Sequence, residues 1–113
     1  NEWDANKCHC SMWRFRDAKG TAAVGSYPSG ASPYGCLDMA GNVWEWCADW
    51  YSSDYYQRGE AQNPTGPERG QDRVLRGGSW SNEDSCDFRA AGRSDLEPDF
   101  MNDFVGFRCV SHA

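Results

Sequence analysis

Cysteine thiols are the first groups of this chain that could carry chemistry. An even number of cysteines in a short chain permits disulfides, or a mixture of buried thiols with one or two bridges. Cys8 and Cys10 are separated by a single histidine, yet the chain has no second Cys/His pair at the spacing of a zinc finger. We therefore interpret these two residues as a loop disulfide arm or as buried thiols. The six cysteines are Cys8, Cys10, Cys36, Cys47, Cys86 and Cys109.

The segment from Asp38 to Glu45 is a second candidate site. Calcium takes about six to eight hard oxygen ligands, which are carboxylates and backbone carbonyls. The segment offers two carboxylates, with the carbonyls of Gly41 and Val43 between them, and the glycine lets the chain curl. The helix-flanked calcium loop, however, has three early carboxylates. The spacing alone therefore favours a turn aspartate and a solvated strand glutamate.

Short extended elements must position these residues. The densest apolar segment runs from Cys36 to Tyr51, and its tryptophans and Val43 favour a β-strand. Side chains alternate along a strand, so Trp44 and Trp46 are expected to share one face. Residues 73–76 are predicted as a strand that is interrupted by the glycines at 77–78 and resumes at 79–80. A closing strand is expected over residues 105–110, and a short helix or strand over residues 88–94. Surface loops are expected over the polar stretches, namely residues 1–32, 52–72, 81–87 and 95–103.

Length and charge restrict the classes of function. The chain has 113 residues, which suits one domain over residues 1–113, and its net charge is −6. An acidic chain without clustered Lys and Arg is a poor partner for nucleic acid. No stretch approaches the roughly 18 apolar residues of a membrane span. Residues 1–4 do not resemble a secretory signal, although such a signal could have been removed.

Four segments, in this order, resemble the formylglycine-generating enzyme (sulfatase-modifying factor) family: Pro33–Trp46, Arg73–Trp80, Arg89–Ser94 and Val105–Cys109. The Gly-Asn-Val-Trp-Glu-Trp and Arg-Gly-Gly-Ser-Trp blocks are the most specific. The resemblance covers the chain from about Thr21 onward and implies an irregular, loop-rich α+β fold related to C-type lectins. It also implies that the chain corresponds to the C-terminal portion of a longer family domain.

The resemblance implies a structural calcium ion. The family's calcium site corresponds to Asp38, Gly41, Val43 and Glu45 of this chain. A second family site would lie near His9 and Asp17, but a histidine stands there in place of an oxygen donor.

The resemblance also bears on catalysis. The family enzyme oxidises a substrate cysteine with copper(I) held by two cysteines, and soft thiolates suit that ion. The corresponding window, Trp80–Asp87, contains only Cys86, and the family's second cysteine aligns with Ser85. We therefore expect neither the catalytic pair nor copper, with Cys86 as a weak catalytic candidate. The usual disulfide partner of Cys109 would lie upstream, which leaves Cys109 unpaired or joined to a local cysteine such as Cys47.

Two functions from different classes follow from the resemblance. The first is a binding module for a protein or small-molecule ligand, related to the retroelement-diversified binders of this fold. Its acids favour a cationic or hydroxyl-rich partner. The second is an oxidoreductase, either the formylglycine-generating oxidase or the substrate-shaping domain of an ergothioneine-type sulfoxide synthase. A periplasmic or secreted location is favoured over the cytoplasm. The expected ligand-binding residues are Trp80, Asn82, Asp84, Asp87, Leu96, Phe100 and Phe104, although Phe100 and Phe104 are also explained as core residues.

Overall fold

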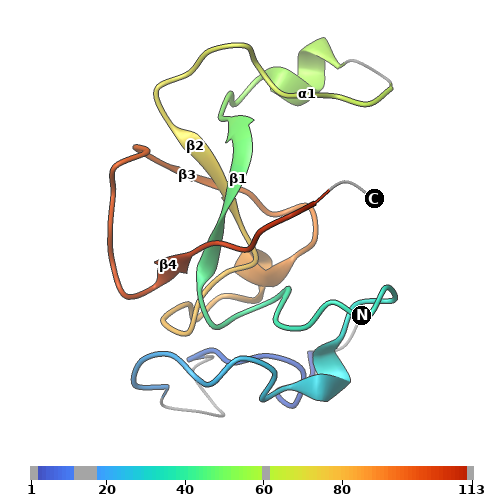
Figure 1. Ribbon diagram of the computed structural model, residues 1–113, viewed down its shortest axis with the longest axis vertical. Coiled ribbons are helices and arrows are strands. Elements are labelled where there is room, and N and C mark those ends of the chain that lie inside the picture. The colour runs from blue at the N-terminus through green and yellow to red at the C-terminus, as the bar shows by residue number, and fades with distance from the viewer. Residues whose placement is uncertain (1–2, 12–17, 60–61, 112–113) are drawn as a thin grey trace.

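A four-stranded mixed sheet forms the centre of the computed structural model, which describes residues 3–11, 18–59 and 62–111 (Figure 1). The strands lie in the order β3-β2-β1-β4. The β1–β2 and β2–β3 pairs are antiparallel, whereas β4 runs parallel to β1. The strands are β1 (Trp44–Trp50), β2 (Arg73–Arg76), β3 (Ser94–Leu96) and β4 (Val105–Gly106).

β1 is the longest strand and pairs on both of its edges. Its aromatic and acidic residues alternate, and Trp44 is 9% exposed. Trp46 pairs with Leu75 of β2, and Trp50 pairs with Arg73 after an irregularity in register between the two tryptophans. Leu75 is 1% exposed, so the contact between β1 and β2 is the centre of the small core.

The helical elements are short and lie outside the sheet. A 3-10 turn, η1, covers Pro28–Gly30, the helix α1 covers Tyr55–Arg58, and a second 3-10 turn, η2, covers Ser85–Phe88. In Figure 1, α1 lies beyond the far end of β1, while the N-terminal third of the chain forms a layer of loops at the opposite end. The sequence therefore folds into a loop-rich α+β architecture, as predicted. No helix among the described residues is long and apolar enough to cross a membrane.

The strand at residues 73–76 confirms its prediction, and the strand expected within residues 36–51 is confirmed over Trp44–Trp50, but four other expectations were wrong in detail. The second strand does not resume at residues 79–80, because the two preceding glycines have φ values of +95° and +71° and turn the chain away. The closing strand is confined to Val105–Gly106, because only Trp44 and Glu45 of β1 pair with it.

The region between residues 85 and 96 also differs from the prediction. Residues 88–94 do not form one element: η2 ends at Phe88, and a turn closed by the Gly92 amide on the Arg89 carbonyl leads to β3. Asp95 and Leu96, predicted in a loop, belong to β3, because β2 offers a free antiparallel edge to them.

No disulfide joins the cysteines in the described part of the chain. Cys36, Cys86 and Cys109 are exposed thiols, and Cys47 is partly buried. The sulfur atoms of Cys8 and its neighbour Cys10 are 3.9 Å apart, well beyond a disulfide bond of about 2.05 Å. Of the two interpretations of this pair, the structure supports buried thiols.

Gly78 and Gly20 offer a matched test of packing at the turn after β2. Both have positive φ, but a Cβ at Gly78 would lie 2.6 Å from Cε1 of Phe88, whereas nothing lies within 4 Å of one at Gly20. We expect Gly20→Ala to lower the free energy of unfolding by about 1–2 kcal/mol through backbone strain alone. Gly78→Ala should cost about 1–3 kcal/mol more through overpacking. Urea unfolding of both variants measures the difference, and equal losses would contradict the packing described here.

Candidate cation site and recognition surface

The turn that precedes β1 joins several distant segments. Asn42 adopts φ +65°, and the residue is only 8% exposed. Its amide hydrogen bonds to the His9 carbonyl, and its carbonyl accepts from the Trp80 amide at 2.7 Å. Its side-chain oxygen accepts from the Ala22 amide at 3.0 Å. The turn is therefore held in a defined shape by segments on either side of it in the sequence.

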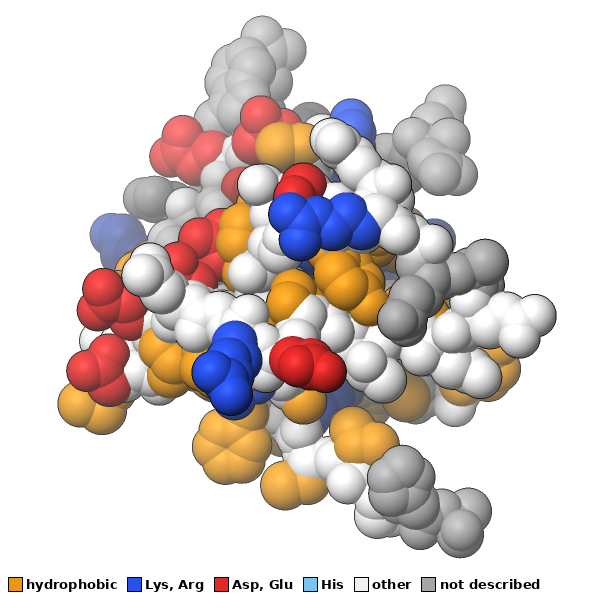
Figure 2. Space-filling model, turned by 90° about the horizontal axis from the view of Figure 1, so that it is seen from above, with side chains coloured by type: hydrophobic (Ala, Val, Ile, Leu, Met, Phe, Trp, Pro, Cys, Tyr) orange, Lys and Arg blue, Asp and Glu red, His pale blue; other side chains and the backbone are white. Residues whose placement is uncertain are grey.

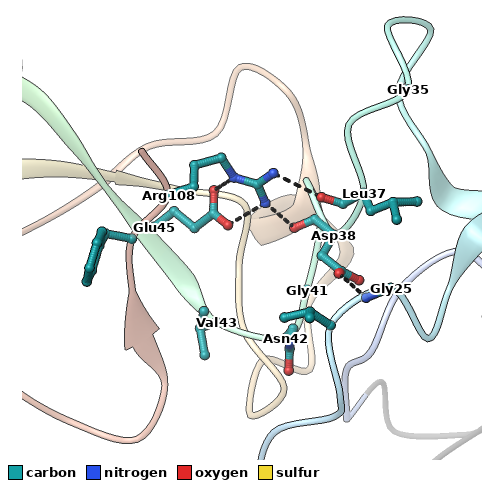
Figure 3. A pocket seen from close by; sticks show the side chains of 11 residues that line it. Gly25, Gly35, Leu37, Asp38, Gly41, Asn42, Val43, Glu45 and Arg108 are labelled. Atoms are coloured by element: carbon teal, nitrogen blue, oxygen red, sulfur yellow. Dashed lines mark hydrogen bonds and ion pairs between the residues drawn. The ribbon is translucent and has the colours of Figure 1, made fainter. Parts of the chain in front are cut away.

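The guanidinium of Arg108 lies beside this turn and across from β1 (Figure 3). Its Nε and one terminal nitrogen donate to the two carboxylate oxygens of Glu45 at 2.6 and 2.5 Å. Its terminal nitrogens also donate to the carbonyls of Leu37 at 3.0 Å and Asp38 at 3.1 Å. These hydrogen bonds, mainly those to Glu45, raise the pKa of Arg108 above its usual value. One cation thus gathers four oxygens from the turn and from β1.

A cavity of about 490 Å³ contains this group of charges. Val24, Leu37 and Phe107 contribute apolar surface to its wall. The carboxylate of Asp38 is directed toward the amide of Gly25, which donates to it at 2.7 Å. The cavity is thus lined by apolar side chains together with two carboxylates and one guanidinium.

All four residues predicted to ligate calcium, Asp38, Gly41, Val43 and Glu45, line this cavity. Carboxylates and backbone carbonyls are the ligands that calcium prefers, so the donor set fits a hard cation. The fit is incomplete, because both carboxylate oxygens of Glu45 are already bound to Arg108. Among the described residues, no cluster of three or more His, Cys, Asp or Glu side chains offers an alternative metal site.

The second family ion site is not assembled in the described part of the chain. Asp17 lies outside the described residues. One ring nitrogen of His9 is 3.1 Å from the Tyr27 hydroxyl, and the other is 2.9 Å from the Gly20 carbonyl oxygen. Both nitrogens of His9 are therefore engaged within the protein.

The residues predicted to bind a ligand fall into two groups rather than one. The first group lies where β4 begins. The indole nitrogen of Trp80 donates to the Asp103 carbonyl at 3.3 Å, and the rings of Phe100 and Phe104 are 6.1 Å apart. Both phenylalanines are partly exposed, and Met101 between them is 89% exposed. Leu96 belongs to β3, where it pairs with Arg73, at the start of the loop to β4.

The second group surrounds η2, which Figure 1 shows separated from the β3–β4 loop. Asn82 accepts from the amide and hydroxyl of the buried Ser79, both at 2.8 Å, and donates to Asp87 at 2.6 Å. Asp84 begins η2, and its carboxylate accepts from the Cys86 amide at 2.9 Å. These side chains hold the turn together, and most of their hydrogen-bonding capacity is used within it.

Cys86 has an environment that disfavours its thiolate. The side chain is exposed, and the hydrogen bond with Asp84 is the main cause that raises the pKa of Cys86. In the opposite direction, the hydrogen bonds from Cys86 lower the pKa of Asp84. The ionised form of Asp84 and the protonated form of Cys86 are therefore both favoured.

The sequence predicts a strand over residues 105–110 but does not reveal the role of Arg108 within it. Its place in the Gly-Phe-Arg segment gave no sign of a contact with Glu45, which lies 63 residues away. No local feature of the sequence distinguishes Arg108 from the other arginines of the chain.

Comparisons with known proteins identify the family of the chain. The family model described as "Sulfatase-modifying factor enzyme 1-like domain" matches residues 1–113. The chain is 48% identical to the formylglycine-generating enzyme of Streptomyces coelicolor, over 92% of this chain and 36% of the enzyme. It is 50% identical to a serine/threonine-protein kinase, pkn1, of Chlamydia caviae, over 80% of this chain and 14% of the kinase.

A solved structure, Treponema denticola variable protein 1, has the same fold. It is 28% identical and superposes with a TM-score of 0.70 over 90% of this chain and 34% of the other. The chain thus spans only a minor part of each of these relatives. The family model matches the whole length of the chain, and the fold and the similarities agree with it. The chain therefore belongs to the sulfatase-modifying factor (formylglycine-generating enzyme) family.

Proposed function

We propose that this chain is a recognition module of the family, which binds a protein or small-molecule ligand through the β3–β4 loop and Trp80. The observation that carries the proposal is the exposure of Met101 between two partly exposed phenylalanines, on a loop fixed at its base. The Trp44 amide donates to the Phe104 carbonyl at 2.8 Å, which anchors the loop to β1. Apolar and polarizable side chains on a rigidly anchored loop are suited to recognition.

Charge and similarity add support to this role. In Figure 2, acidic side chains gather on the left edge of the molecule, the side on which Figure 1 places the β3–β4 loop. A cationic or hydroxyl-rich partner is favoured by such a surface, whereas nucleic acid is disfavoured. The name of the Treponema relative describes a variable protein, and variation on a fixed scaffold suits recognition.

The alternative function is an oxidoreductase, which the similarity to the formylglycine-generating enzyme favours. Copper(I) chemistry needs two thiolates, yet the segment from Trp80 to Asp87 contains a single cysteine, Cys86. The raised pKa of that thiol further disfavours a metal-binding thiolate. We therefore propose that the chain lacks the catalytic cysteine pair.

We also propose that a structural calcium ion binds in the cavity at the turn before β1. Asp38 and Glu45 would supply carboxylates, and Gly41 and Val43 would supply carbonyls. The ion would strengthen the connection between the turn and β1, with no direct part in chemistry. Support comes from the shared cavity of all four residues and from the hard oxygen chemistry of the donor set.

The recognition surface can be tested with a glycan array and a lysine-rich peptide as probes. Phe100→Ala should weaken the binding of whichever probe is retained by at least about fivefold, while the melting temperature stays nearly unchanged, since ring burial is partial. Val110→Ala serves as the control, because this position is 88% exposed and lies outside the β3–β4 loop. If Phe100→Ala unfolds the domain, the ring is core and the proposal loses its main support.

Asp84 requires a different substitution, because its carboxylate also begins η2. Asp84→Ala would remove this cap and cost about 1 kcal/mol of stability, which confounds a binding measurement. Asp84→Asn keeps an acceptor for the Cys86 amide and removes the charge. We expect it to weaken binding of the lysine-rich peptide only if the partner reaches η2, and a comparison of binding by Asp84→Asn and Phe100→Ala maps the extent of the surface.

The oxidase alternative predicts conversion of a cysteine-containing sulfatase-type peptide. We expect no formylglycine product when the chain is incubated with copper(I), oxygen and this peptide, as measured by mass spectrometry. The formylglycine-generating enzyme of Streptomyces coelicolor is the positive control. Product that disappears in Cys86→Ser would show that a single thiol suffices and would overturn the non-catalytic proposal.

Calcium binding should raise the melting temperature, because an ion that binds only the folded state stabilises it. At a calcium concentration about 100 times its dissociation constant the gain is about 2.7 kcal/mol. Asp38→Asn is the matched variant, since an amide oxygen can still accept from the Gly25 amide while the charge is lost. Thermal melts with calcium and with excess chelator should differ for the wild type and differ less for Asp38→Asn. Identical melts of the wild type in both conditions would rule out the ion.

A further inference from the structure

Arg108 occupies the place that a bound cation needs. Its guanidinium binds both carboxylate oxygens of Glu45 and the carbonyls of Leu37 and Asp38. These are hard oxygens of the kind that calcium prefers, and they converge on one positive group. The cavity that contains the proposed ion ligands also contains Arg108. The protein therefore fills part of its own cation site with a side chain.

We infer that Arg108 is an internal competitor of calcium for Glu45, and that calcium binding displaces its guanidinium from the carboxylate. This inference rests on the calcium site proposed above, and it adds what sets the affinity of that site. The two-pronged contact gives each oxygen of Glu45 a cationic partner, so an ion that approaches the same face of this carboxylate has to displace the guanidinium.

The balance of charge in the cavity supports mutual exclusion. Asp38 and Glu45 are the acidic side chains of the cavity wall, and Arg108 is its basic one. A divalent ion beside a retained guanidinium would leave excess positive charge between two carboxylates. With the guanidinium outside, the two carboxylates balance the ion. Like charges a few ångströms apart in a partly buried site repel strongly, so the neutral combination is favoured.

The structure also allows Arg108 to leave. Its side chain is 36% exposed, which gives the guanidinium a path to water, whereas that of Glu45 is 21% exposed. The backbone of the preceding strand, β4, stays attached through the pairing of Val105 and Gly106 with β1. Displacement of the side chain therefore does not require the strand to separate from the sheet.

Calorimetric titration with calcium alone tests the inference on three proteins: the wild type, Arg108→Gln and Arg69→Gln. Arg69→Gln is the charge-matched control, because Arg69 is exposed and lies outside the cavity. Removing an ion pair worth about 1 kcal/mol should tighten calcium binding by Arg108→Gln roughly fivefold. Arg69→Gln should change affinity far less.

The outcomes separate this inference from the calcium proposal. Binding to Arg108→Gln but not to the wild type would support competition in its strongest form. Equal affinities of wild type and Arg108→Gln, or weaker binding by the variant, would overturn the competition while the calcium site stands. Absence of binding to all three proteins would overturn both, and the melts described above would then show no calcium effect either.

A second measurement needs no substitution and covers the case in which Arg108→Gln fails to fold. The Nε–H of Arg108 donates to Glu45 and gives a distinct side-chain signal in nitrogen–proton correlation spectra of the wild type. Calcium should shift this signal and speed its exchange with water, since the hydrogen bond is lost. A signal that stays constant while the backbone amides of the turn respond to calcium would show that ion and arginine bind together, which contradicts the inference.

Discussion

The turn at Asn42 is the constraint on which the rest of the structure depends. Its buried side chain and backbone hydrogen-bond to three segments that are distant in the sequence, at His9, Ala22 and Trp80. A left-handed conformation there is costly for most residues, and asparagine is one of the few that accept it. Because β1 begins two residues later, this turn sets the direction of the central strand and the position of Glu45.

Arg108 then joins the end of the chain to the beginning of β1. The contact with Glu45 spans 63 residues, and the sheet brings the two side chains together by placing β4 parallel to β1. Partly exposed ion pairs contribute modestly to stability on their own. This ion pair also places a positive group on the Glu45 carboxylate, which is one of the ligands of the proposed calcium site.

Relatives with the same scaffold carry different functions in their names, including an enzyme, a kinase and a variable protein. A shared fold does not by itself assign one of these functions, since function depends on the local site. In this chain the turn after β2 is stabilised by Ser79, Asn82 and Asp87, and the hydrogen bond with Asp84 raises the pKa of Cys86. The overall similarity is compatible with either of the proposed functions.

The sequence by itself determined the family, the two principal strands and the set of oxygen donors at the turn. Those features depend on local patterns: aromatic and β-branched runs favour strands, and a compact segment keeps its own residues close together. Only the tertiary structure decided that Arg108 binds Glu45, that β4 is two residues long, and that the predicted binding residues are divided between the region of η2 and the region where β4 begins. The physical reason is that contacts between residues far apart depend on strand register and on the direction of each side chain. A local sequence pattern does not contain this information, because register is set when the distant segments pair.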